Sequence, residues 1–136
     1  MVCRPIRPHR LRVATPFVQG QNSRDVIRSA MPGGARVSYY NKEERCNYVA
    51  RSQFENVVEG LRQRFGRVFV MLEFADVEKC TEACHAAKPE TWWTCACVCG
   101  GLHHGGGGTG RAAGWKPVGD HLLVSSQRFW REFEVR

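Results

Sequence analysis

Cysteine side chains cluster in one short stretch of this 136-residue sequence. Two are spaced C-x3-C, at Cys80 and Cys84, and three are spaced C-x-C-x-C, at Cys95, Cys97 and Cys99. Residues four apart on a helix share one face, and alternate residues of a strand point to the same side. Each group can therefore direct its thiols at a single ion, and the spacing predicts a metal-binding segment over residues 80–105.

This segment holds more ligands than one ion needs, because zinc takes four in a tetrahedron. We expect Cys80 and Cys84, together with two of the three later cysteines, to bind a structural Zn²⁺, with His104 as the leading substitute. An iron–sulfur cluster also uses thiolates, but the C-x2-C-x2-C run typical of such clusters is missing. Unligated buried cysteines, which behave as small apolar residues, are the remaining alternative.

The same stretch resembles a Cys-rich segment of small uncharacterised phage and bacterial proteins. The resemblance covers Cys80 to Gly105 and consists of C-T-x-x-C-x-x-A followed by C-x-C-x-C-G-G-x-x-H-G. It implies a metal site and an origin in a mobile element, and it implies no particular activity. The segment is also loosely similar to SWIM-type zinc modules, although the C-x-H half of those modules is missing here.

Positive charge is concentrated in the first quarter of the chain, whose net charge of +7 is uneven. Residues 1–36 hold seven Arg and one acid, which gives +6. Such a segment attracts polyanions such as nucleic acid or an acidic protein surface, although a solvated basic tail has the same composition. Two tryptophans of the Cys-rich segment could stack on bases. The candidate nucleic-acid-binding residues are Arg4, Arg7, Arg10, Arg12, Arg24, Arg28, Trp92 and Trp93.

Apolar periodicity predicts the elements that must position these groups. Residues 52–65 have helical spacing, with Ser52 and Glu55 placed for a capping box and Gly66 placed as a C-terminal cap. A β-hairpin over 36–51 precedes this helix, and an unbroken apolar strand over 67–74 follows it. Two further strands, 121–125 and 128–135, are expected to form a C-terminal hairpin.

We therefore expect an α+β fold with a ββαβ core and one main packed helix. A single domain over 35–136 would carry the zinc-stabilised Cys-rich insertion and the C-terminal hairpin. Residues 1–34 would form a basic, largely irregular segment, apart from a short helix that could run from Ser23 to Ala30.

These patterns favour a non-enzymatic zinc-binding module, resembling a zinc finger, that binds DNA or RNA through its basic N-terminal segment. One alternative is a phage-type inhibitor that docks on a host protein. Another is a metal-dependent nuclease that uses Glu73 or Asp76, although the acids near Lys79 have the wrong spacing. No secretory signal or membrane span is apparent, so the expected location is the reducing cytoplasm.

Overall fold

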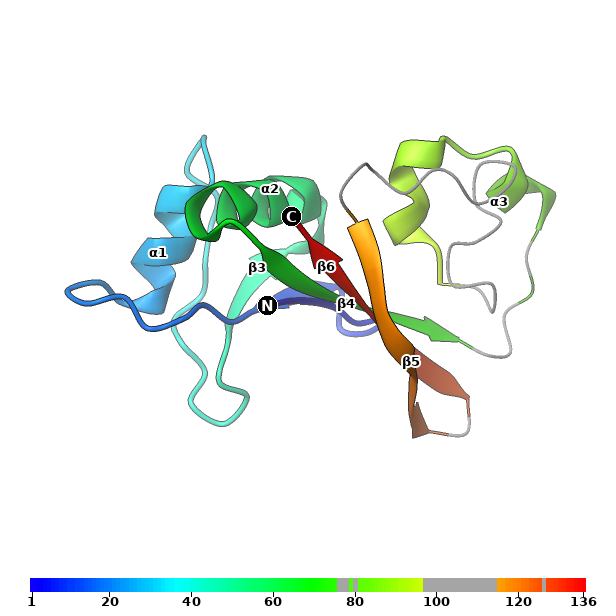
Figure 1. The fold of residues 1–136 in the computed structure, drawn as a ribbon, viewed down its shortest axis with the longest axis horizontal. Helices are drawn as coiled ribbons and strands as arrows, with labels where there is room; N and C mark the ends of the chain where they lie inside the picture. The colour runs from blue at the N-terminus through cyan, green and yellow to red at the C-terminus, as the bar shows by residue number, and fades with distance from the viewer. Residues whose placement is uncertain (76–78, 80, 97–114, 126) are drawn as a thin grey trace.

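Six strands form one mixed sheet with helices on one face, so the protein has the α+β architecture (Figure 1). The structure is a computed structural model that describes residues 1–75, 79, 81–96, 115–125 and 127–136. The sheet order is β3-β2-β1-β4-β6-β5, and its neighbours are antiparallel except for the parallel pair β1 and β4. The strands are β1 Val2–Arg4, β2 Arg10–Val13, β3 Asn47–Ala50, β4 Val68–Ala75, β5 Trp115–Ser125 and β6 Arg128–Val135.

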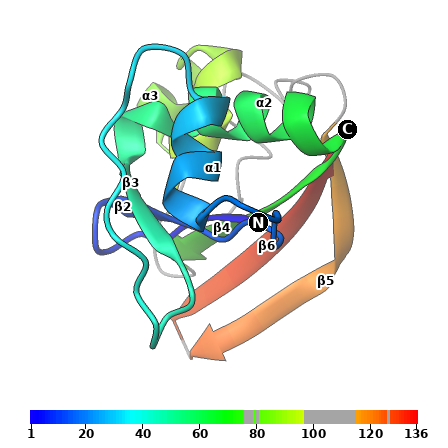
Figure 2. The same cartoon turned by 90° about the vertical axis from the view of Figure 1, so that its left-hand side faces the viewer.

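Two helices, α1 (Ser23–Ala30) and α2 (Phe54–Phe65), lie together on one face of the sheet (Figure 2). Along β4 the side chains that meet this helical layer alternate, as the twofold period of a strand requires. The core between sheet and helices is apolar and includes Leu11, Val26, Ile27, Val57, Leu61, Val70, Leu72, Phe74 and Phe133. None of the helices in the described ranges has both the length and the apolar character needed to span a bilayer.

The N-terminal segment is more ordered than the sequence predicts. Residues 1–34 contain β1, β2 and α1, and β1 lies inside the sheet between β2 and β4. The expectation of a largely irregular segment is therefore wrong for these residues. Strands of three and four residues are too short for a clear period, and their stability comes from pairing. β1 pairs with β4, which lies more than sixty residues away, and β2 pairs with β1 and β3.

The central elements were predicted more accurately. The strand β4, the C-terminal hairpin and the short α1 helix are present. Of the hairpin expected over 36–51 only the second strand forms, as β3, which pairs with β2; residues 36–40 are not a strand and meet β3 at the isolated bridge between Val37 and Val49. A 3₁₀ turn, η1 (Arg51–Gln53), precedes α2, so the N-cap lies one residue later than the expected Ser52. The capping box of Ser52 and Glu55 does not form, because Gln53 is the N-cap and makes no side-chain capping bond. Gly66 ends the helix in the left-handed region, as predicted.

Gly60 allows α1 and α2 to cross at very short range. A Cβ atom on this residue would lie 1.8 Å from the backbone oxygen of Ala30, at the end of α1. Glycine inside a helix costs about 1 kcal/mol relative to alanine, so its presence here needs a packing reason. The close crossing is that reason, and it fixes where α1 sits on the sheet.

The described part of the Cys-rich segment packs onto the same core. It contains α3 (Glu82–His85) and a 3₁₀ stretch, η2 (Pro89–Thr94). Trp92 packs edge-on against Trp115 and Phe133, with ring centroids 5.3 and 5.1 Å apart, and Trp93 stacks on Phe54 at 4.4 Å. This aromatic cluster joins the segment to α2 and to the C-terminal hairpin.

Candidate nucleic-acid interface and candidate metal centre

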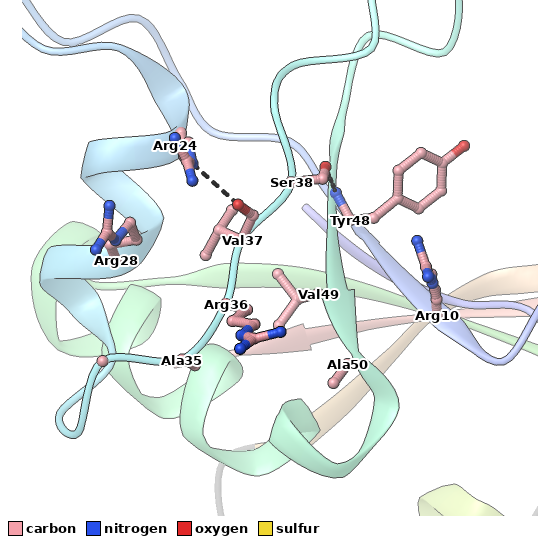
Figure 3. A pocket seen from close by; sticks show the side chains of 11 residues that line it. Arg10, Arg24, Arg28, Ala35, Arg36, Val37, Ser38, Tyr48, Val49 and Ala50 are labelled. Atoms are coloured by element: carbon pink, nitrogen blue, oxygen red, sulfur yellow. Dashed lines mark hydrogen bonds between the residues drawn. The ribbon is translucent and has the colours of Figure 1, made fainter.

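Four arginines from three parts of the chain surround one pocket of about 490 Å³. Arg10 comes from β2, Arg24 and Arg28 come from α1, and Arg36 comes from the segment between α1 and β3 (Figure 3). The remaining lining residues are small, apolar or uncharged, and β3 supplies Tyr48, Val49 and Ala50. The pocket lining therefore combines four positive charges with uncharged residues.

Hydrogen bonds through a buried asparagine hold the walls of this pocket together. Asn47 is fully buried at the start of β3; its amide oxygen accepts a bond from Ser23 Oγ (2.7 Å), and its amide nitrogen donates to Ser38 O (2.9 Å). Arg24 Nε also donates to Val37 O at 2.9 Å. The first turn of α1, strand β3 and the segment at 36–38 are thus fixed relative to one another, so the pocket is preorganised.

No carboxylate is among the described residues that line the pocket. Within the described ranges, none of its four arginines forms an ion pair. By contrast, Arg12 Nε lies 3.4 Å from Glu44 Oε2, and Glu44 also accepts a hydrogen bond from Tyr48 Oη. Unneutralised guanidinium groups that surround one cavity are suited to bind a phosphate, through charge-assisted hydrogen bonds of fixed geometry.

Charge alone identified three of these four arginines. Arg10, Arg24 and Arg28 come together as part of the predicted set, whereas Arg36, although it ends the same basic stretch, was assigned to the predicted hairpin over 36–51 and was missed. The signal that the sequence offered for Arg36 was its position at the start of a β-prone run. Arg7 is exposed but does not line the pocket.

Two of the predicted contact residues are buried and therefore unsuited to bind nucleic acid. Arg4 is fully buried, with its side chain on the same face of β1 as Val2, so it presents no guanidinium to a phosphate. Trp92 is only 2% exposed within the aromatic cluster and cannot stack on a base. Trp93 is half-buried, stacks on Phe54 and donates from Nε1 to Glu55 (3.1 Å).

A pair of cysteines from the predicted metal-binding segment is brought together at the other end of the molecule. Cys84 of α3 and Cys95, which follows η2, place their Sγ atoms 3.4 Å apart. Two sulfurs bound to one zinc at about 2.3 Å would stand roughly 3.8 Å apart in a tetrahedron. A disulfide would need about 2.05 Å. The observed spacing is too long for a disulfide and is one at which two thiols make a hydrogen bond, so both sulfurs lie close enough together to reach one ion.

Each cysteine of this pair is positioned by contacts of its own. Thr81 caps α3, because its side chain accepts a bond from the Cys84 backbone N–H (3.3 Å). Cys95 N donates to Trp92 O at 3.1 Å, and the next residue, Ala96, accepts from Ala75 N at the end of β4 (2.8 Å). The buried Trp92 and the central strand thus fix Cys95 against the sheet.

A buried positive charge lies beside this pair. Arg4 Nη2 donates to Cys95 O at 3.0 Å, and the guanidinium stands over the Phe74 ring at 5.1 Å. Nε and Nη1 of Arg4 are buried and have no hydrogen-bond partner among the residues that the structure describes. Burial, together with the charge of Arg51, lowers the pKa of Arg4 to about 9, so the group is still charged at neutral pH. A buried guanidinium favours a negative charge nearby, and the thiol of Cys95 and the carboxylate of Glu73 both act to raise the pKa of Arg4.

The other predicted ligands, Cys80, Cys97, Cys99 and His104, lie outside the described residues. Among the residues that are described, no group of three or more His, Cys, Asp or Glu side chains is placed to hold a metal ion. Cys3 and Cys46, which were not expected to be ligands, lie in β1 and immediately before β3.

The nuclease alternative depends on Glu73 and on acids after β4. Glu73 is almost fully buried, accepts a bond from Ile6 N (2.7 Å) and pairs with Arg128 (3.8 Å). Through these contacts Glu73 links the segment after β1 to β4 and β6, which is a structural role. Asp76 and Glu78 lie outside the described residues.

Comparison with known proteins adds no further identification. No family model matches the sequence, and neither the curated proteins nor the solved structures give a match.

Proposed function

We propose that the protein is a non-enzymatic, zinc-stabilised module that binds nucleic acid through the arginine-lined pocket. The observation that carries this proposal is the convergence of Arg10, Arg24, Arg28 and Arg36 on one cavity without a carboxylate. Phosphate contacts by arginine supply the sequence-independent part of nucleic-acid affinity. Non-specific recognition of the backbone is therefore the expected mode of binding.

The number of arginines sets the salt dependence. Each neutralised phosphate contributes about 0.7 to the slope of log affinity against log salt for single strands, and about 0.9 for duplexes. Four contacts give a slope of about −3 to −4. Affinity should then fall by about 50- to 150-fold between about 50 and about 200 mM salt.

The test is a titration of a fluorescent oligonucleotide at several salt concentrations, read by anisotropy. Arg28→Gln combined with Arg36→Gln removes two charges from the pocket and should reduce the magnitude of the slope by about 1.4 to 1.8. Lys116→Gln is the matched control, because β5 forms the opposite edge of the sheet from β3. Absence of binding at low salt would refute the proposal, and recovery of a specific acidic protein would then favour the inhibitor alternative.

The zinc part of the proposal is supported by the Cys84–Cys95 spacing and by the buried charge of Arg4. Thiolates bound to Zn²⁺ carry net negative charge, which the adjacent guanidinium would offset. The other two ligands would come from the sequence candidates Cys80, Cys97, Cys99 and His104. Zinc here would stabilise the fold rather than catalyse a reaction.

Elemental analysis of the purified protein tests the metal directly. About one zinc per chain and a lower melting temperature after chelation are expected, since metal binding is coupled to folding. Iron in place of zinc would indicate a cluster instead. Protein without stoichiometric metal, whose melting temperature is unchanged by chelator, would refute this part of the proposal.

A further inference from the structure

We infer that the preferred nucleic acid is single-stranded, with one unpaired base stacked on Tyr39 beside the arginine-lined pocket. This inference rests on the proposed function and names the class of nucleic acid that the same site selects. Tyr39 follows the pocket residues Val37 and Ser38, and the residue is 80% exposed. An aromatic ring this exposed has no role in the core.

One face of the Tyr39 ring is already occupied by a pocket arginine. The guanidinium carbon of Arg24 lies 4.4 Å from the ring centroid, and Nε of the same residue is bound to Val37 O. The cation–π contact and the hydrogen bond hold the ring in place without covering it. The free face is then prearranged to stack on a base, at little cost in side-chain entropy.

A second hollow, of about 250 Å³, adjoins the arginine-lined pocket, and Arg24 lines both. It is lined by Asn22, Ser23, Arg24, Asp25, Tyr39 and Tyr40. Unlike the pocket, it contains a carboxylate, which repels phosphate but accepts hydrogen bonds from the amino groups of bases. The arginine-lined pocket is thus suited to the phosphate of a nucleotide, and the second hollow, with its tyrosines, is suited to the base.

This arrangement discriminates against duplexes. Within a duplex both faces of a base are stacked on its neighbours, so a base can reach Tyr39 only after it leaves the stack, which costs a few kcal/mol of unstacking and unpairing. In a single strand the bases can turn outward onto an aromatic side chain. The phosphate contacts alone would not distinguish the two forms in this way.

The experiment compares three DNA probes of about 12 nucleotides, a length within the range of known single-strand sites. One is a single strand, the second is its duplex, and the third is an abasic strand with the same phosphates. The single strand should bind more tightly than the other two. Tyr39→Ala should weaken single-strand binding by between about 5- and 150-fold, the range supplied by one stacked base, and leave abasic binding unchanged.

Tyr39→Phe is the matched control, because it keeps the ring and loses only the hydroxyl; it should bind as the natural protein does. Duplex binding as tight as single-strand binding, or equal loss of abasic binding in Tyr39→Ala, would overturn this inference while the proposed function stood. Failure of all three probes to bind at low salt would instead overturn the proposed function.

Discussion

Substitution of Gly60 by alanine should reduce both the stability of the fold and the affinity of the arginine-lined pocket. The new Cβ atom would lie 1.8 Å from Ala30 O and 2.7 Å from the carbon of the same carbonyl. A carbon and an oxygen in contact need about 3.3 Å. The backbone of α1 cannot rotate away as a side chain could, so the two helices must separate by roughly 1.5 Å.

The size of the effect follows from two opposing contributions. Overpacking costs about 1–3 kcal/mol, and a backbone contact this short belongs at the upper end. Alanine regains about 1 kcal/mol of helix propensity. The free energy of unfolding should therefore fall by about 2 kcal/mol, which corresponds to a drop in melting temperature of roughly 8 °C for a chain of this size.

Urea unfolding followed by tryptophan fluorescence measures the stability change, because three of the tryptophans pack in the aromatic cluster. Gly66→Ala is the comparison: it introduces the same methyl group where no atom lies within 4 Å, although the left-handed backbone costs about 1–2 kcal/mol. Only Gly60→Ala should also weaken oligonucleotide binding well below its melting temperature, because it displaces α1. A Gly60→Ala protein as stable as the natural one would refute the reasoning.

Three further predictions concern ionisable groups. Hydrogen bonds from Arg62 and Gln63 lower the pKa of Glu59 to about 2, so its ionised form stabilises the fold above the ordinary carboxyl pKa of 4.5, and this contribution is lost as the pH falls through about 2. Because Glu59 is exposed the effect is small, and Glu59→Gln should flatten the acid side of the melting-temperature profile; superimposable profiles would contradict this. Burial raises the pKa of the Cys3 thiol to about 11, so iodoacetamide should modify it slowly at about pH 8, as followed by mass spectrometry. Modification at the rate of an exposed cysteine would contradict that expectation. Arg4→Met should weaken zinc binding by about 10- to 100-fold in a chelator competition, as loss of groups that support metal ligands commonly does, and unchanged affinity would argue against a charge-balancing role.

Long elements with a clear period could be predicted from the sequence, and short ones could not. The apolar stripe of α2 and the unbroken run of β4 each bury many side chains, so local pattern and tertiary packing agree. The strands β1 and β2 contain few residues and exist because they pair with each other and with β4. That pairing is a long-range event, which no local window of sequence contains.

The candidate site shows the same division. Charge density identified Arg10, Arg24 and Arg28, but nothing in the sequence shows that segments far apart meet with Arg36 at one cavity. Arg4 was misassigned because charged side chains are rarely buried. The alternation of Val2, Cys3 and Arg4 would have placed Arg4 on the core face once a strand was recognised.

The two proposed sites depend on different parts of the fold and can therefore be separated by experiment. The arginine-lined pocket is built on α1 and β3, whereas Cys84 belongs to α3 and Cys95 follows η2, and α3 lies at the opposite end of the molecule from α1 (Figure 1). Trp92 nevertheless carries the Cys-rich segment into the shared core, so metal loss should lower the stability of the whole domain. Chelation should consequently reduce nucleic-acid binding only as the protein unfolds, whereas pocket variants should reduce it in a fully folded protein. If chelation weakened binding without unfolding, zinc would have to contribute to the interface itself.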